Sequence, residues 1–186
     1  MKNKSVLIVG CGDLGTRAGL SLASAGWAVT GLRRDIGQLP VAFTGLAANY
    51  AAANADLSML QTLAPDFVLL TLKPAGSGEA GYRAGFSDAV GAVLRGLGSH
   101  RPAGILMVSS TRVYAEADGG WVEDDSPLVT TDPAAGAIID AEQQLFDSLH
   151  PACTVRSAGI YGDPEGFLLR RVARGELCAA SPVRYS

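Results

Sequence analysis

Short apolar runs alternate along the chain with longer segments of helical character. Residues 6–9, 27–32, 66–72 and 104–110 are dominated by apolar side chains, many of them branched, and each run is bounded by glycine, proline or polar residues. Runs of this length without polar interruption are typical of strands that are buried on both faces. A further short run at 153–156 predicts a last strand.

The segments between these runs predict helices. Residues 18–25 form a stretch of small side chains that ends at Gly26, and residues 81–97 carry apolar side chains every three or four positions. We also expect a helix over 137–149, and a weak strand and a short helix within 47–63, whereas 115–135 predicts a surface loop. Strands that alternate with helices indicate an α/β fold with a doubly wound parallel sheet covered on both faces.

A glycine motif follows the first predicted strand. The segment Gly10-Cys11-Gly12-Asp13-Leu14-Gly15 has the spacing GxGxxG and opens the first helix of a βαβ unit. In this context Gly10 permits a tight turn, Gly12 lets a pyrophosphate approach the backbone, and Gly15 lets helix and strand pack closely. The motif therefore predicts a dinucleotide site at a helix N-terminus. The alternative is an ordinary glycine-rich turn, with Cys11 as a small buried residue or as a thiol activated by the helix.

The end of the second predicted strand bears on the choice of cofactor. Arg33 and Arg34 stand 18 and 19 residues after Gly15, and Asp35 follows them. Arginine at this place accommodates the 2′-phosphate of NADP, whereas an acidic residue binds the ribose 2′-hydroxyl of NAD. The sequence favours NADP(H). The alternatives are NAD(H) with Asp35 as the ribose ligand, and arginines that only end a strand in solvent.

Composition limits the other function classes. The 186 residues are 48% hydrophobic and 18% charged with a net charge of −3, which indicates a globular protein and gives no basic footprint for nucleic acid. No apolar run approaches the roughly 20 residues of a membrane span. Cys11, Cys153 and Cys178 lie too far apart for a disulfide framework or a zinc site, so we expect no metal. We expect a soluble cytoplasmic protein; a homo-oligomer is left open.

With the glycine motif, the segment Val108-Ser109-Ser110-Thr111-Arg112-Val113-Tyr114 resembles the NAD(P)-dependent epimerase/dehydratase family, the extended branch of the short-chain dehydrogenase/reductases. Asn54-Ala55-Asp56-Leu57 is similar to the family's adenine-contacting Asp-Leu. Residues 156–162 are similar to its R-x-x-G-I-Y-G motif. The resemblance implies a Rossmann-type fold over residues 1–186 and a carbonyl or alcohol substrate such as a nucleotide sugar. It also implies a small substrate lobe that starts at about residues 163–186 and is otherwise missing or truncated.

The resemblance also implies a catalytic set that is incomplete here. Ser110 matches the family's Ser/Thr, which orients the substrate oxygen, but Ala134 and Ile138 stand where its Tyr-x-x-x-Lys pair is expected. No lysine follows Lys73, and Tyr114 is the nearest candidate phenol for proton transfer. The chain therefore resembles atypical members of the superfamily. Two functions stay open: an oxidoreductase-like enzyme, or a dinucleotide-binding module without turnover that acts as a redox sensor or binds a partner.

The predicted site thus has a cofactor part and a catalytic part. The catalytic candidates are Ser110 and Tyr114. The predicted cofactor-binding residues come from the glycine motif, the strand ends and the family-like segments: Gly10, Gly12, Asp13, Leu14, Gly15, Arg33, Arg34, Asp56, Leu57, Thr71, Lys73, Ser109, Arg156 and Ser157.

Overall fold

A single parallel sheet organises the computed structural model, which describes residues 3–160 and 167–176. Its six strands lie in the order β3-β2-β1-β4-β5-β6, and every neighbouring pair is parallel. The predicted fold class is confirmed. The strands are β1 (Ser5–Val9), β2 (Ala28–Arg33), β3 (Thr44–Ala47), β4 (Phe67–Leu70), β5 (Gly104–Ser110) and β6 (Ala152–Ser157).

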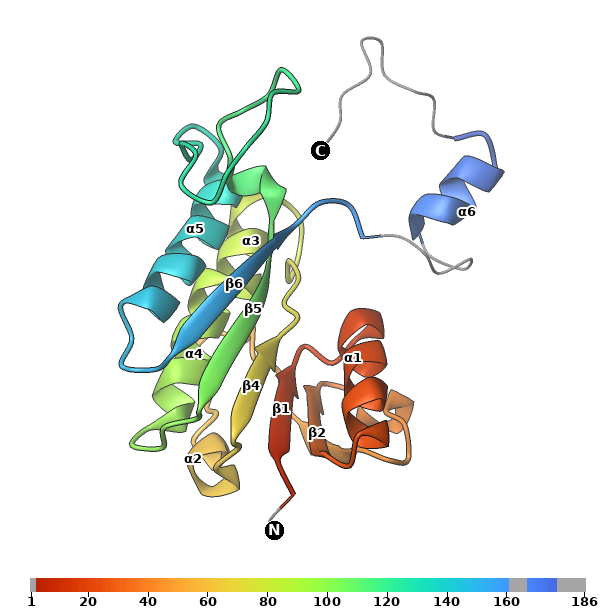
Figure 1. Ribbon diagram of the computed structural model, residues 1–186, viewed down its shortest axis with the longest axis vertical. Coiled ribbons are helices and arrows are strands. Elements are labelled where there is room, and N and C mark those ends of the chain that lie inside the picture. The colour runs from red at the N-terminus through yellow and green to blue at the C-terminus, as the bar shows by residue number, and fades with distance from the viewer. Residues whose placement is uncertain (1–2, 161–166, 177–186) are drawn as a thin grey trace.

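Helices lie on both sides of this sheet, with α1 on one face and α3, α4 and α5 on the other (Figure 1). β1 shows how the sequence specifies the two layers. Val6 and Ile8 pack with Leu22 of α1, whereas Leu7 and Val9 belong to the larger core that α4 and α5 cover. The helices are α1 (Asp13–Ser24), α2 (Met59–Leu63), α3 (Gly78–Gly85), α4 (Ser87–Leu97), α5 (Pro133–Phe146) and α6 (Phe167–Ala173), with 3-10 turns η1 (Ile36–Gln38) and η2 (Thr111–Val113).

Three predicted helices differ from the observed ones. The helix expected over 18–25 begins earlier, at Asp13. The helix expected over 81–97 is divided into α3 and α4 at Phe86, whose backbone (φ −120°, ψ −73°) is not helical. Just before it, Gly85 packs so closely that a Cβ there would lie 2.8 Å from the Cα of Pro74. The helix expected over 137–149 begins earlier, because Asp132 accepts a hydrogen bond from the Ala134 amide and Pro133 occupies the first turn.

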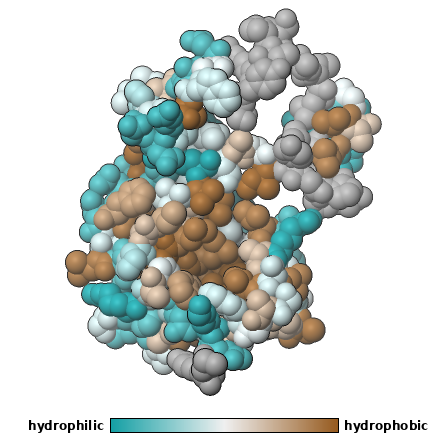
Figure 2. Space-filling view, viewed as in Figure 1, coloured by the Kyte–Doolittle hydropathy of each residue, from teal (hydrophilic) through white to brown (hydrophobic). Residues whose placement is uncertain are grey.

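One part of the sheet is not covered as predicted. α1 packs on β1 and β2, and beside it the same face of β4, β5 and β6 forms a shallow apolar groove of about 430 Å³. Leu106 and Val155 on this face are 37% and 46% exposed. Figure 2 shows the apolar side chains gathered over the middle of the molecule in this view. The expectation of a sheet covered on both faces is therefore wrong for these strands among the described residues.

Candidate functional site

The carboxyl ends of the strands open into a cleft of about 1310 Å³. The strand order reverses between β1 and β4, so the loops after these two strands diverge and leave a crevice between them. Open parallel sheets bind ligands at such a switch point. The cleft is lined from five loops: residues 10–15 after β1, 33–35 and Gln38 after β2, 49–51 after β3, 71–76 after β4, and Ser109 and Ser110 at the end of β5, together with Phe86, Val108, Ser157, Ala158 and Ile160.

The three glycines of the motif have different surroundings. Gly10 has φ +78°, and a Cβ on it would lie 2.5 Å from the carbonyl oxygen of Thr71. A Cβ on Gly15 would lie 2.8 Å from Thr71 Oγ1 and 2.9 Å from Ile8 Cγ2. A Cβ on Gly12 would meet nothing nearer than 3.7 Å. Gly10 and Gly15 are therefore needed by the protein itself, whereas the space at Gly12 is open to the cleft.

Thr71 ties the end of β4 to this loop. Its hydroxyl donates a 2.9 Å hydrogen bond to the Gly10 carbonyl, and its amide donates to the Val9 carbonyl at 3.0 Å. Next to Gly10, Cys11 is fully buried, and burial raises the pKa of its thiol despite the nearby Arg33. The structure thus favours the buried alternative for Cys11.

A chain of polar contacts follows β2 along the cleft wall. Arg33 donates from Nη1 to the Cys11 carbonyl at 3.1 Å and from Nη2 to Gln38 Oε1 at 2.5 Å. Gln38 Nε2 donates to Asp35 Oδ2 at 2.8 Å, and Asp35 Oδ1 accepts from the Gly37 amide at 3.0 Å. Among the described residues, Arg34 forms no ion pair, although it lines the same wall.

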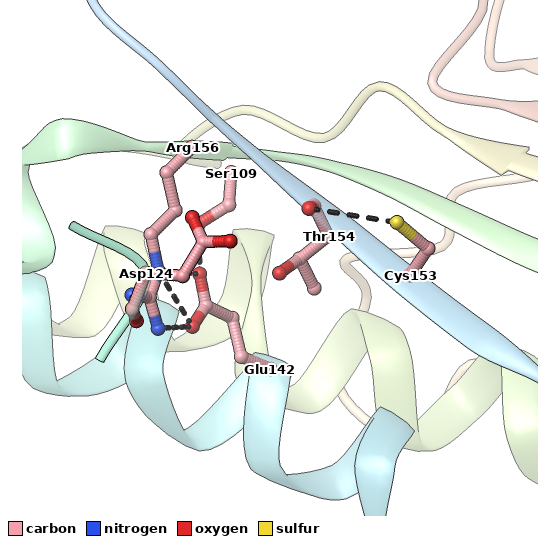
Figure 3. A network of polar contacts seen from close by, with 6 residues as sticks. All are labelled: Ser109, Asp124, Glu142, Cys153, Thr154 and Arg156. Carbon is pink, nitrogen blue, oxygen red and sulfur yellow. Dashed lines mark hydrogen bonds and ion pairs between the residues drawn. The ribbon is translucent and has the colours of Figure 1, made fainter.

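A buried ion pair joins α5 to β5 and β6 (Figure 3). Glu142, only 3% exposed, accepts a 2.7 Å hydrogen bond from Arg156 Nη2 and a 2.5 Å hydrogen bond from the Ser109 hydroxyl. Arg156 also donates to the Asp124 carbonyl at 3.0 Å, and its guanidinium lies 5.0 Å from the centre of the Tyr114 ring. Hydrogen bonds from the guanidinium to the carboxylate raise the pKa of Arg156 above its usual range. These contacts fix how α5 lies on the sheet.

The position of α5 decides what faces the end of β5. Ala134 lies eight residues before Glu142 and Ile138 lies four residues before it, so all three share one face of the helix. Both are buried, at 8% and 1% exposure. Their apolar side chains offer no group that moves a proton, and the structure thus brings no replacement to these two positions.

A second polar group lies beside the first turn of α5. The Ser110 hydroxyl accepts a 3.2 Å hydrogen bond from the Arg112 amide. The Arg112 side chain donates to Asp132 at 2.7 Å and to the Tyr82 hydroxyl at 3.2 Å. The Tyr82 ring stacks on Phe86, a residue of the cleft wall, at 5.9 Å. A phenol and a guanidinium therefore meet at Asp132, the residue that caps α5.

Two kinds of site are not seen in the described part of the chain. No three His, Cys, Asp or Glu side chains in that part gather as metal ligands. No described helix has the length and apolar character to cross a membrane.

Comparison with known proteins gives matches in structure only. No family model and no curated protein matches the sequence. A protein assigned as an NAD-dependent epimerase/dehydratase from Methylobacillus flagellatus superposes with a TM-score of 0.75 at 26% identity, over 93% of this chain and 59% of that one. UDP-glucuronic acid 4-epimerase from Bacillus cereus, solved with NAD, gives 0.75 at 18% identity, over 91% and 61%. A UDP-galactose 4-epimerase gives 0.75 at 15%, over 92% and 62%.

The chain shares the fold of the NAD-dependent epimerase/dehydratases. This shared fold supports the family resemblance found in the sequence motifs. The chain spans about three fifths of the length of these structures.

Most of the predicted cofactor residues meet in the cleft. Three of them, Asp56, Leu57 and Arg156, lie outside its walls, as does the catalytic candidate Tyr114. The carboxylate of Asp56 accepts a 2.9 Å hydrogen bond from the Ser58 amide, and Leu57 is a core residue at 2% exposure. Tyr114 and Arg156 pack on each other behind the cleft. The family-like segment 156–162 is only partly visible, because residues 161 and 162 fall outside the described residues.

Three residues near the site were not anticipated from the sequence. Tyr50 lines the cleft after β3, and burial raises the pKa of its phenol. Its loop has no periodic signal that predicts this placement. Gln38 also lines the cleft. Its position three residues after Asp35 was the sequence feature that could have indicated this placement. Tyr82 precedes Phe86 by four residues, a helical spacing that places both on one face, but nothing local connects it to Arg112.

Proposed function

We propose that this chain binds NADP(H) in the cleft and acts in an oxidoreductase-like protein of the epimerase/dehydratase type. The observation that carries the proposal is the shared cleft of the glycine loop and the two arginines after β2. Gly12 leaves the backbone open where a pyrophosphate approaches, and the amides at the start of α1 provide hydrogen-bond donors for it. Structural neighbours solved with NAD support a nicotinamide dinucleotide as the ligand.

The charges of the cleft favour a ligand with an additional phosphate. Arg33, Arg34 and Lys73 line it, and neither Arg34 nor Lys73 forms an ion pair with another described residue. Of the carboxylates in the wall, Asp13 pairs with Arg17 at 3.1 Å, and Asp35 is turned into its own loop. A positive wall at the end of β2 supports NADP(H) over NAD(H).

Ser110 is the residue of this chain that we assign to the substrate. Its oxygen accepts a hydrogen bond from Arg112, which leaves the hydroxyl hydrogen to donate to a carbonyl or alcohol oxygen in the cleft. When bound, the nicotinamide supplies hydride transfer. Two of the neighbours are named as epimerases of UDP-glucuronic acid and UDP-galactose, and a third, MoeE5, was solved with UDP-glucose, which supports a nucleotide sugar or a similar carbonyl compound as the substrate class.

A specific observation favours a second function. Ala134 and Ile138 place apolar side chains where the family's proton-transfer pair is expected, on a helix held in position by Glu142 and Arg156. Positioned acid/base groups typically contribute about 10²–10⁴-fold to a rate. A dinucleotide-binding module without turnover, which senses the redox state or binds a partner, is therefore the alternative.

Titration of the 186-residue chain with NADPH and NADH, followed by nicotinamide fluorescence, tests the proposal. We expect saturable binding with NADPH tighter than NADH. No binding of either dinucleotide contradicts the proposal as a whole. A turnover assay then separates the two functions, because only the first oxidises NADPH with a simple ketone, reduces NADP+ with a UDP-sugar, or converts a UDP-sugar into its epimer.

A further inference from the structure

The contacts of Gln38 hold an acidic side chain away from the cofactor cleft. Its side-chain amide lies between Arg33 and Asp35, with Oε1 at 2.5 Å from the guanidinium and Nε2 at 2.8 Å from the carboxylate. Only one orientation of the amide satisfies both partners, since a guanidinium only donates and a carboxylate only accepts. All three side chains line the cleft. Gln38 thus connects the two groups of opposite charge that follow β2.

We propose that Gln38 determines the preference between NADP(H) and NAD(H) by keeping Asp35 turned away from the ribose position. The inference rests on the proposed dinucleotide function and concerns the same cleft. A carboxylate at this end of the sheet accepts the ribose 2′-hydroxyl of NAD and repels a 2′-phosphate. In the structure, both oxygens of Asp35 are engaged within its own loop, one by the Gly37 amide and one by Gln38.

The same contacts give Arg33 and Arg34 different roles in binding a 2′-phosphate. Arg33 is held at both Nη atoms, by the Cys11 carbonyl and by Gln38, and is therefore fixed as part of the wall. Arg34 is exposed, lines the cleft and forms no ion pair with any described residue. We assign the direct contact with the 2′-phosphate to Arg34, with Arg33 adding charge from a fixed place.

A neutral amide suits this position better than a direct ion pair. A carboxylate in contact with Arg33 cancels much of the positive charge that the phosphate needs, whereas the amide keeps the two groups one side chain apart. Without the Gln38 amide, Asp35 is free to pair with Arg33 or to turn toward the ribose. Either movement weakens binding of the 2′-phosphate, and the second also strengthens binding of NADH.

The test is a cycle of variants measured by titration with NADPH and NADH. Gln38→Met keeps the length of the side chain but removes the amide. We expect it to lower the ratio of NADPH to NADH affinity about tenfold. Asp35→Asn alone should leave the ratio within about twofold of wild type, because Asn caps η1 as well as Asp does. The double variant should return to the wild-type ratio.

Gln143→Met is the matched control, because Gln143 donates to Asp147 at 2.8 Å on the exposed side of α5. It should leave the ratio unchanged. Adenosine 2′,5′-bisphosphate and 5′-AMP differ only in the 2′-phosphate. The ratio of their affinities should change across the variants in the same way as the ratio of NADPH to NADH affinity.

Several outcomes overturn the inference. An unchanged ratio in Gln38→Met shows that Gln38 does not set the preference. A double variant that stays as low as Gln38→Met shows that Asp35 is not the group that Gln38 restrains. In either of these two outcomes, tight binding of NADPH by the wild-type chain leaves the proposed function intact. A wild-type chain that binds neither dinucleotide refutes the proposed function and the inference about Gln38 together. Thermal unfolding of each variant identifies a change that comes from loss of the fold.

Discussion

Gly12 is the position where a substitution most sharply separates ligand binding from stability. A Cβ there would meet nothing nearer than 3.7 Å, and the residue has φ −89°, which is accessible to side chains other than glycine. We therefore expect Gly12→Val to change the free energy of unfolding by less than about 1 kcal/mol, since reduced freedom of the unfolded chain offsets a poorer helix cap. For a chain of this size that is about 2–4 °C in melting temperature.

The same change should abolish binding. The two added methyl groups occupy the open space over the glycine loop, where the pyrophosphate has to approach the α1 amides. We expect the NADPH dissociation constant to rise at least about 100-fold, which corresponds to about 2.7 kcal/mol. Fluorescence titration measures it, and urea unfolding measures the stability of the same variant.

Gly15→Val is the comparison, because a Cβ at Gly15 would lie 2.8 Å from Thr71 Oγ1 and 2.9 Å from Ile8 Cγ2. Overpacking of this kind costs about 1–3 kcal/mol, so this variant should lose stability as well as binding. A Gly12→Val protein that binds NADPH within threefold of wild type would refute the placement of the cofactor on this loop. One that fails to fold would refute the reasoning about the space at Gly12.

Three other variants and measurements test the surrounding structure. Glu142→Leu should cost about 3–5 kcal/mol in urea unfolding, because it leaves the half-buried Arg156 without its carboxylate partner, and a loss below 1 kcal/mol contradicts this. The Arg112 side chain lowers the pKa of Asp132. Their ion pair therefore stabilises the fold above the unfolded-state pKa of about 4, and this stabilisation is lost as the pH falls below that value. Asp132→Asn should reduce the resulting fall in melting temperature at acid pH. Iodoacetamide should modify exposed Cys153 well before buried Cys11, as read by mass spectrometry of the peptides.

The sequence by itself determined the alternation of strands and helices and the place of the glycine motif. These features depend on residues close together in the chain. Four apolar residues before Gly10 specify a strand buried on both faces, and the glycine spacing specifies the turn into α1. Gly26 has φ +84°, as its predicted role at the end of that helix requires. The missing phenol and ammonium on α5 were also visible, because the motif resemblance aligned Ala134 and Ile138 with them.

The tertiary structure decided which of these residues meet. Asp56 follows the family-like pattern, yet its carboxylate accepts a hydrogen bond in a local turn outside the cleft, and the part of the chain after β3 that lines the cleft is residues 49–51. Tyr82 and Arg112 are 30 residues apart and meet because α3 packs on α5, whose N-cap Asp132 holds the Arg112 side chain. The break between α3 and α4 lies at Phe86, next to the close approach of Gly85 to Pro74. Contacts of this kind depend on how separate layers pack, and local sequence patterns carry no information about that packing.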